Sequence, residues 1–353
     1  MTGRERFQAA LAHQPVDRIP IHDAPWSTTV ERWHGEGLPA ETSANEFFGY
    51  ELGETWVGVN FKFPPETVED TEEYTLLRNA DGVLAKNWKH ATSTPEWLDY
   101  TLRTRADWEE HKHELAWTGE GMDWETMKRA EQESHRKGQW FCLRGSFAFQ
   151  RVTGFLGMES TFVAMATDPD WTEDMFDLTT VEFCNALDDV LGHGIELDGV
   201  FPANDLGYRN GPLFSPAMFR RFELPNHARY YGCAHGHGLP AILHCCGDVT
   251  PLVGDLIGAG LDCLQPLQVR AGMDLIALKR QYGEKLALMG GIDAPKMAHP
   301  DPAVIEEEIR TKFAVAMEGG GYLYHSDHSI PDNVSFAQYR HVMDLVEKYG
   351  TYK

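Results

Sequence analysis

Residues 239–248 read LPAILHCCGD: a short apolar run that ends in a histidine, two cysteines, a glycine and an aspartate. Such a run predicts a buried strand followed by a polar loop. The segment before it, 215–238, has a long helical pattern with Ser215 as the N-cap and Pro216 as the first helical residue. Another helix is expected to begin at Thr250-Pro251. The stretch therefore predicts one helix–strand–helix unit of a parallel sheet.

The same alternation recurs on both sides of this stretch. Further strands are expected at 194–201, 261–267, 286–289 and 321–324, with helices at 274–282, 301–318 and 335–349. Upstream strand candidates are 18–22, 55–59 and 140–144. Alternating strands and helices are typical of βαβ units, and no G-x-G-x-x-G turn follows the first strand, which disfavours a dinucleotide fold. We predict the α/β class and a (β/α)8 TIM barrel, with residues 1–353 as a single domain.

Residues 60–135 do not fit this alternation. They are rich in Glu, Thr, Trp and Lys, and residues 74–88 (YTLLRNADGVLAKNW) predict antiparallel strands. Asp81-Gly82 is a favourable hairpin turn between them. We therefore predict an insertion in the N-terminal half, over the barrel mouth, that serves as a lid, a dimer contact or a docking surface.

Composition limits the partners that we expect. The chain has 353 residues, 42% of them hydrophobic and 24% charged, which is typical of a globular enzyme. Its formal net charge of -23 disfavours binding to nucleic acid or to an anionic membrane. Large acidic barrels often dimerise, so a homodimer is one expectation, although the sequence leaves the oligomeric state open.

The N-terminus and the cysteines bear on localisation. Residues 1–18 have the pattern of a charged amphipathic helix without the apolar core of a signal peptide. No stretch approaches the roughly 18 apolar residues of a membrane span. We therefore expect a cytoplasmic protein, in which the six cysteines are thiols or metal ligands rather than disulfides.

His244 and Cys246 are the first candidates for chemistry. They lie two residues apart at the end of a predicted strand, and zinc readily accepts such a pair of nitrogen and sulfur ligands. Catalytic groups of (β/α)8 barrels lie at the C-terminal ends of the strands. His328, after the last predicted strand, is our expected third ligand; the alternatives are His325, Asp327, Asp205 and Glu196. Three ligands leave one position for water or substrate.

Other strand ends carry further ionisable residues. His22 and Asp23 follow the first predicted strand, and Asp205 follows the strand at 194–201. We predict these three as catalytic residues. Cys245 is expected to face the core, and Asp248 to cap the helix that follows it.

Aromatic and cationic residues near the predicted strand ends suggest a substrate pocket. Trp26, Phe147 and Tyr208 are expected to line an apolar surface. Arg209, and also Arg144, are candidates to pair with a carboxylate or propionate of a ligand.

Several segments resemble uroporphyrinogen decarboxylase across nearly the whole chain. They are RERF at 4–7, PVDRIP at 15–20, LFSP at 213–216, GGID at 290–293 and GGGY at 319–322. In that family an Arg-Gln-Ala-Gly-Arg-Tyr segment follows the first strand and binds the propionate groups of the substrate. Residues 22–26 of this chain read HDAPW, without an arginine. The departure disfavours decarboxylation of a porphyrin.

The segment His244-x-Cys246-Gly247 is similar to the zinc motif of the cobamide-dependent methyltransferases in the same superfamily. These enzymes usually supply a cysteine after the last strand as the third ligand, and His328 stands at that position here. The resemblance implies Zn²⁺ as cofactor and a corrinoid (cobalamin) carried by a partner protein.

Two roles occur among such methyltransferases. One transfers methyl from a methoxylated aromatic to the cob(I)alamin of a corrinoid protein, which is O-demethylation. The other methylates a thiol from a methylcobamide protein. The aromatic rim and the predicted insertion favour the first role. Two alternatives remain: decarboxylation of a polycarboxylate, with Asp23 as its acid, and a barrel that binds a corrinoid without chemistry.

Overall fold

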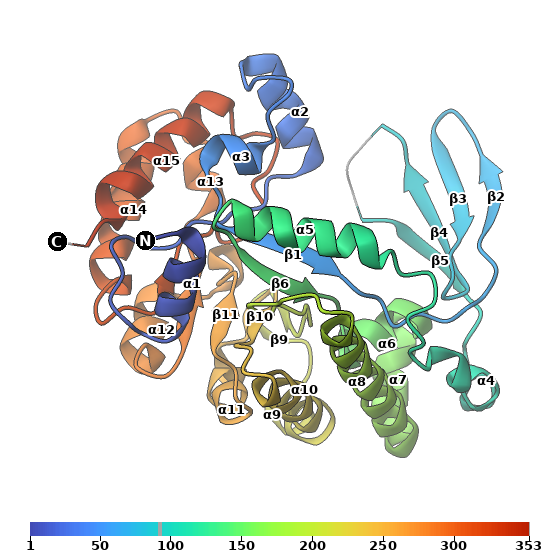
Figure 1. Cartoon of the computed structure of the whole chain (residues 1–353). Helices are drawn as coiled ribbons and strands as arrows, with labels where there is room; N and C mark the ends of the chain where they lie inside the picture. Colours follow the sequence, from blue (N-terminus) through green and yellow to red (C-terminus); the bar gives the residue numbers. More distant parts are fainter. Residues whose placement is uncertain (91–93, 353) are drawn as a thin grey trace.

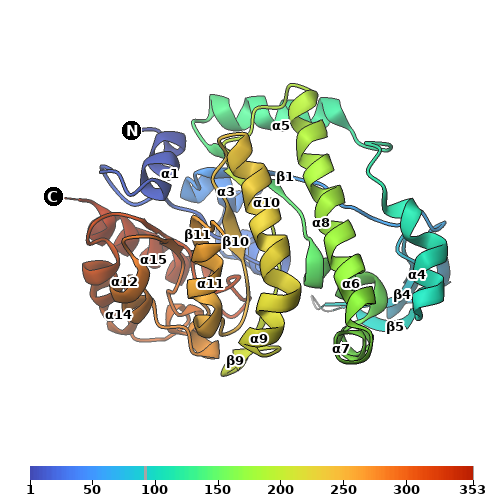
Figure 2. The same cartoon turned by 90° about the horizontal axis from the view of Figure 1, so that it is seen from below.

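The computed structural model describes residues 1–90 and 94–352 as a mixed α/β fold with parallel strands inside and helices outside (Figure 1, Figure 2). Residues 91–93, within the predicted insertion, and residue 353 lie outside the described part. One parallel sheet has the order β1 (Leu52–Trp56), β6 (Trp140–Arg144), β7 (Gly199–Val200). The other has the order β10 (Ile242–His244), β11 (Cys263–Gln265), β12 (Ala287–Met289), β13 (Tyr322–Leu323).

Single backbone contacts link the two parallel sheets. A parallel bridge between Val200 and Ala241 joins β7 to β10, and another between Ile21 and Tyr324 joins the first extended segment to β13. The Glu51 amide donates a 2.8 Å hydrogen bond to the carbonyl of Ile21, just before β1. Neighbouring parallel strands thus follow one another in chain order, a TIM-barrel-like arrangement.

Most strands are shorter than the apolar runs predicted. The strand expected over 194–201 is limited to Gly199–Val200, and the one expected over 239–243 begins only at Ile242. Pro202 and Pro240 lie beside these short ladders and have no amide hydrogen to donate. The apolar pattern therefore predicted which residues are buried rather than how far the ladders extend. The strand expected at 55–59 lies at Leu52–Trp56, whereas β6 has the predicted bounds.

Side chains of β6 alternate between two cores. Trp140 and Cys142 belong to the inner cluster enclosed by the strands, and Phe141 and Leu143 pack in the larger cluster against the helices. The period of two directs the next residue, Arg144, inward at the C-terminal end of the strand.

The strand β10 has the same alternation. Ile242 belongs to the inner cluster, and Leu243 and Cys245 to the outer one. His244 and Cys246 therefore continue the inward-facing row above the inner core. The expectation that Cys245 faces the core is confirmed, since it is 2% exposed.

Helices cover the outside of the strands (Figure 2). They include α6 (Ala148–Leu156), α7 (Met158–Thr167), α8 (Pro169–Gly192), α10 (Leu224–Gly236), α11 (Val253–Gly258), α12 (Leu275–Tyr282), α13 (Ala294–Met297), α14 (Pro302–Ala316) and α15 (Phe336–Gly350). The predicted N-cap Ser215 accepts an amide hydrogen bond at its helix start, and so do Asp274, Asp301 and Ser335, the first residues of three other predicted helices.

The long helix predicted over 215–238 is confirmed, because helical turns run from Pro216 to Gly236. They comprise α9 (Pro216–Met218), a π-helical turn, Phe219–Glu223, and α10. Pro225, which lies in the first turn of α10, cannot donate the amide hydrogen bond of a continuous α-helix. The N-terminal helix α1 spans only Gly3–Leu11, because His13 has a positive φ of 53° and Pro15 follows.

Four strands within 66–90 and 94–100 form a separate antiparallel sheet to one side of the parallel strands (Figure 1). Its order is β2 (Glu66–Asp70), β3 (Tyr74–Arg78), β4 (Val83–Trp88), β5 (Glu96–Tyr100). The hairpin predicted over 74–88 is confirmed, with Gly82 at a φ of 73° in its turn. The helix α5 (Trp124–Arg136), by contrast, packs on β1 and β6 as their crossover helix.

Within the described residues, no helix combines the length and the apolar composition that crossing a bilayer requires.

Candidate active site

Three of the predicted residues converge at the C-terminal ends of β10 and β13. The Nε2 atom of His244 lies 3.2 Å from the Sγ atom of Cys246, and Nε2 of His328 lies 3.2 Å from the same sulfur. Asp205 joins them, with Oδ1 3.7 Å from Nε2 of His244. The structure thus brings together one thiol, two imidazoles and one carboxylate from three loops.

Backbone contacts fix the loop that carries Cys246. Its amide donates a 2.9 Å hydrogen bond to Oδ1 of Asp205. Gly247 follows with a φ of 83°, and a Cβ there would lie 2.1 Å from the carbonyl carbon of Gly207. Only glycine permits this close approach. The loops after β7 and β10 are therefore held together at the site.

Gln265, at the end of β11, orients His244. Its Oε1 atom lies 2.5 Å from Nδ1 of His244, and its Nε2 atom lies 3.2 Å from Nε2 of His325. An amide oxygen accepts, so Nδ1 of His244 carries the proton and Nε2 presents its lone pair toward Cys246. Gln265 was missed by sequence reasoning, although its place at a predicted strand end was a usable signal.

Burial keeps both imidazoles neutral. The pKa of His244 is lowered to about 4, chiefly by desolvation, with the nearby Arg144 charge acting in the same direction. Burial also lowers the pKa of His328, although Asp327 and Asp205 oppose the shift. Neutral imidazole is the form that binds a metal.

The alternative third ligands have other contacts. Asp327 is buried and accepts amide hydrogen bonds from Ala294 at 3.0 Å and Val269 at 3.1 Å. Nδ1 of His325 lies 2.7 Å from the carbonyl oxygen of Ser326, and its Nε2 faces Gln265. Both residues therefore have structural partners.

Glu196, the last alternative, is not near His244. Its carboxylate lies within 4.8 Å of ligand atoms of Glu131 and His135, on the helix α5. Glu196 precedes β7, so it lies at the N-terminal side of the strands.

Asp23 is buried beside the loop that carries His328. Its Oδ1 accepts a 2.5 Å hydrogen bond from the Ser326 hydroxyl, and its Oδ2 accepts one of 2.9 Å from the Tyr339 hydroxyl. The Ser326 hydroxyl also contacts the carbonyl of His328. Asp23 therefore connects the first extended segment, the loop of His328 and the helix α15.

His22 faces the interior beside His325, with ring centroids 5.6 Å apart. Its Nδ1 is buried and has no hydrogen-bond partner within the described residues. Burial, together with the charges of His325 and Arg144, lowers its pKa well below the usual value.

The predicted substrate-binding residues divide into two groups. Trp26, Tyr208 and Arg209 have exposed side chains on loops that follow strands. Phe147 is fully buried and stacks on Phe183 and Tyr230 of the outer helices. Phe147 therefore packs behind the strands and does not offer its ring to a substrate.

Arg144 is the cation that faces the barrel mouth. Its guanidinium lies 3.8 Å from the ring centroid of Phe201 and 5.0 Å from that of Trp56. Its Nε atom is buried without a hydrogen-bond partner in the described chain, and Glu54 lies 3.5 Å from it. The exposed ring of Trp56 is a further site residue that sequence reasoning missed.

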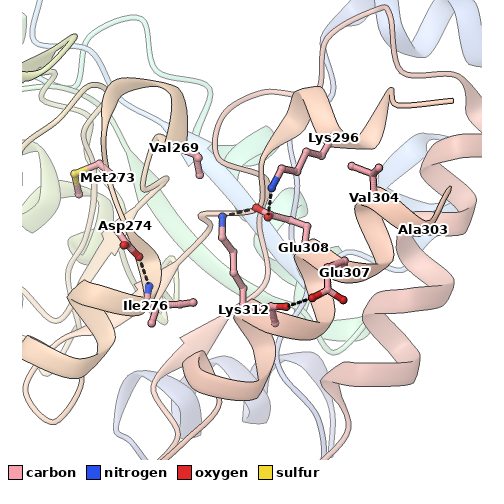
Figure 3. Close-up of a pocket in the computed structure, with 11 residues that line it drawn as sticks. Val269, Met273, Asp274, Ile276, Lys296, Ala303, Val304, Glu307, Glu308 and Lys312 are labelled. Carbon is pink, nitrogen blue, oxygen red and sulfur yellow. Dashed lines mark hydrogen bonds and ion pairs between the residues drawn. The ribbon is translucent and has the colours of Figure 1, made fainter. Parts of the chain in front are cut away.

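A separate groove of about 800 Å³ lies among the outer segments around α12 and α14 (Figure 3). Its two lysines, Lys296 and Lys312, both contact the carboxylate of Glu308. None of its lining residues is His244, Cys246, His328 or Asp205. Both lysines thus share one carboxylate, and two further acidic residues, Asp274 and Glu307, also line the groove.

Comparison with known proteins agrees with this architecture. The family model "Uroporphyrinogen decarboxylase (URO-D)" matches residues 151–349. Two relatives named uroporphyrinogen decarboxylase are similar over short stretches. The protein from Pectobacterium carotovorum is 36% identical over 61 residues, 17% of each chain, and that from Mannheimia succiniciproducens is 31% identical over 78 residues, 22% of each. These matches thus span about a fifth of the relatives' length.

A solved structure described as a methyltransferase from Methanosarcina mazei has a similar fold. It superimposes with a TM-score of 0.66 at 16% identity and covers 99% of each chain. The parallel strands, outer helices and polar strand ends place the protein in the TIM-barrel-like α/β class. Within this class, the chain belongs to the uroporphyrinogen decarboxylase family.

Proposed function

We propose that this protein is a zinc-dependent methyltransferase. It would move a methyl group from a methoxylated aromatic to the cob(I)alamin of a corrinoid protein. The observation that carries this proposal is the convergence of His244, Cys246 and His328, with both imidazole Nε2 atoms 3.2 Å from the thiol sulfur.

The donor set suits zinc. Two neutral imidazoles and one thiol are ligands that Zn²⁺ accepts, and three protein ligands leave a position open for a substrate atom. Bound zinc would supply a Lewis acid for the ether oxygen of the substrate. Asp205 would hold the Cys246 backbone through its 2.9 Å hydrogen bond and place its Oδ1 3.7 Å from Nε2 of His244. Gln265 would fix the His244 ring.

Asp23 and His22 would support the site without binding the metal. Asp23 would hold the loop of His328 through Ser326, which makes it a positioning residue rather than a direct proton donor. His22 would remain neutral and present its unpartnered Nδ1 inside the barrel mouth.

Aromatic and cationic side chains support an aromatic substrate. Trp26, Tyr208 and Trp56 are exposed, and such rings stack on aromatic ligands. Arg144 has a buried, unpartnered Nε and only one carboxylate, Glu54, at 3.5 Å. A carboxylate on the substrate would complete its hydrogen bonding, whereas the exposed Arg209 would contribute at the rim.

The fold supports two further parts of the proposal. The single bridges between the two parallel sheets are those expected where eight strands close into a (β/α)8 barrel. We propose residues 60–135 as an insertion that docks the corrinoid protein. Exposed Val68, Trp97 and Leu98 on its sheet provide apolar contact area. The same surface would serve a homodimer, the alternative use.

Methyl transfer and metal content together test the function. The wild-type protein is purified without chelator and mixed with cob(I)alamin and methoxylated benzoates, and methylcobalamin is followed by absorbance. We expect methylcobalamin and one phenol per turnover, and no turnover by the C246A variant. Transfer from methylcobalamin to a thiol only would support the thiol methyltransferase instead. Carbon dioxide released from a polycarboxylate by zinc-free protein would contradict the proposal and favour decarboxylation.

A further inference from the structure

A second group of metal-ligating side chains lies between two outer helices. The helices α8 and α10 run side by side in both views (Figure 1, Figure 2). Cys184 and Asp188 are four residues apart on α8, and Cys233 and His237 are four residues apart at the end of α10. Residues at this spacing share one face of a helix. Each helix therefore presents one thiol and one further ligand to the same place.

Three of these four side chains lie close together. Nε2 of His237 lies 2.6 Å from Oδ1 of Asp188. The ligand atoms of Asp188, Cys233 and His237 all lie within 4.8 Å of one another. Cys184 lies one helical turn before Asp188 on the same face of α8 and would bring a second thiol to this group. The cluster thus contains two sulfurs, one imidazole and one carboxylate.

Both thiols are free and accessible to a metal. Neither forms a disulfide, and both side chains are only partly buried. Cys184 and Cys233 therefore have no disulfide to break before they can bind a cation.

We propose that Cys184, Cys233, His237 and Asp188 form a second zinc site, which is structural and fastens α8 to α10. Two sulfurs, one nitrogen and one oxygen are a set that tetrahedral Zn²⁺ accepts. Four protein ligands leave no open position, as in structural rather than catalytic sites. Zinc binding would replace the thiol protons and stabilise the folded state by mass action.

The second site is separate from the barrel mouth. His237 ends α10, before the chain enters the extended segment 239–244 that leads to His244. Five extended residues span about 16 Å, so the two ion positions lie at opposite ends of β10. This proposal does not depend on the proposed methyl transfer.

Cobalt titration of the full chain in the C246A background tests the site. Cobalt(II) bound by thiolates in a tetrahedral site gives intense sulfur-to-metal absorbance, and C246A removes the thiol of the barrel mouth. We expect one such cobalt per chain in C246A. Affinity should fall at least 100-fold in C246A/C233S and C246A/H237A, and about 10- to 100-fold in C246A/D188N, a variant that keeps both thiols.

The matched control is His235→Ala in the same background. His235 is also exposed on α10 and pairs with a carboxylate, Asp262, at 2.8 Å, but it does not belong to the group of ligand atoms around Cys233. We expect this variant to bind cobalt like its parent. Absence of thiolate absorbance in C246A, or equal absorbance in C246A/C233S, would overturn the proposal. A Cys184–Cys233 disulfide in anaerobically purified protein, detected by mass spectrometry, would overturn it as well.

Zinc stoichiometry separates this proposal from the proposed function. Wild-type protein should contain two zinc ions per chain, with one lost in C246A and the other lost in C233S. One zinc that is lost only in C246A would contradict the second site alone. One zinc that is lost only in C233S would contradict the barrel-mouth site alone.

Discussion

The Nε2 atom of His328 lies 3.2 Å from the Sγ atom of Cys246, although the two residues are 82 positions apart. They are neighbours because β10 and β13 end at the same edge of the parallel strands. Asp327, the residue before His328, accepts two backbone amides and anchors this loop. The site therefore depends on loop anchoring as much as on the ligands themselves.

Removing a ligand should weaken zinc binding at the barrel mouth. In the H237A background, which lacks a ligand of the proposed second site, H244A and C246A should each weaken zinc binding at least 100-fold, and H328A by a comparable factor. The reason is that each residue offers one of only three donors. Competition with a chromophoric chelator measures the affinity. C245A, which alters a buried neighbour outside the site, should retain zinc; if H328A also retains it, the third ligand is another residue.

Gln265 should control zinc affinity without touching the metal. Q265A removes the oxygen that lies 2.5 Å from Nδ1 of His244. Loss of such an orienting partner typically weakens metal binding about 10- to 100-fold. The same chelator competition measures this effect, and Q265E should restore much of the affinity because a carboxylate also accepts from Nδ1. Unchanged affinity in Q265A would show that the ring is held by other contacts.

Arg144 should set the preference for acidic substrates. R144M should raise KM for a methoxybenzoate about 10- to 100-fold, since a charge-assisted hydrogen bond contributes about 1.5–3 kcal/mol. The KM for an uncharged methoxybenzene should change little. Steady-state kinetics with both substrates measure the difference, and R280M, which changes an exposed arginine on α12, is the control. Equal effects on the two substrates would assign Arg144 a structural role.

Asp23 should stabilise the fold. D23A would leave the buried Tyr339 hydroxyl without its acceptor, whereas the Ser326 hydroxyl would keep the His328 carbonyl. An unsatisfied buried donor costs about 1–3 kcal/mol, so we expect a loss of this size in the free energy of unfolding, measured in urea. Y339F removes only one of these bonds and should cost less. A D23A variant as stable as wild type would contradict the buried network.

Glu308 should contribute pH-dependent stability. Burial raises its pKa, but hydrogen bonds from Lys296 and Lys312 outweigh this and leave the pKa below its usual value. A carboxylate with a lowered folded pKa stabilises the protein fully above the unfolded pKa of about 4.3, and this stabilisation is lost as pH falls through the folded pKa.

The K296M/K312M double variant tests this prediction. It should lose about 3 kcal/mol at pH 7, and the difference from wild type should shrink as the pH falls from the unfolded pKa of about 4.3 towards the lowered folded pKa of Glu308. Urea unfolding at several pH values measures the difference. K285M changes an exposed lysine and should have little effect at any pH; a difference independent of pH would refute the linkage.

The sequence by itself determined the α/β alternation, the starts of several helices and the hairpin at 74–88. These features depend on local patterns: apolar periodicity, capping residues such as Ser215 and Asp274, and the Asp81-Gly82 turn. It also singled out His244 and Cys246, because a two-residue spacing on a strand directs both side chains to one face.

Only the tertiary structure decided what depends on distant contacts. Phe147 and Trp26 are both aromatic residues near strand ends, but packing buried the first against α8 and α10 and left the second exposed. Gln265 and Arg144 lie at the candidate site because neighbouring parallel strands bring residues from separate segments to one edge. A sequence pattern indicates on which face of a strand or helix a side chain lies. The residues that it contacts depend on strand order and register, because these bring together residues that are far apart in the chain.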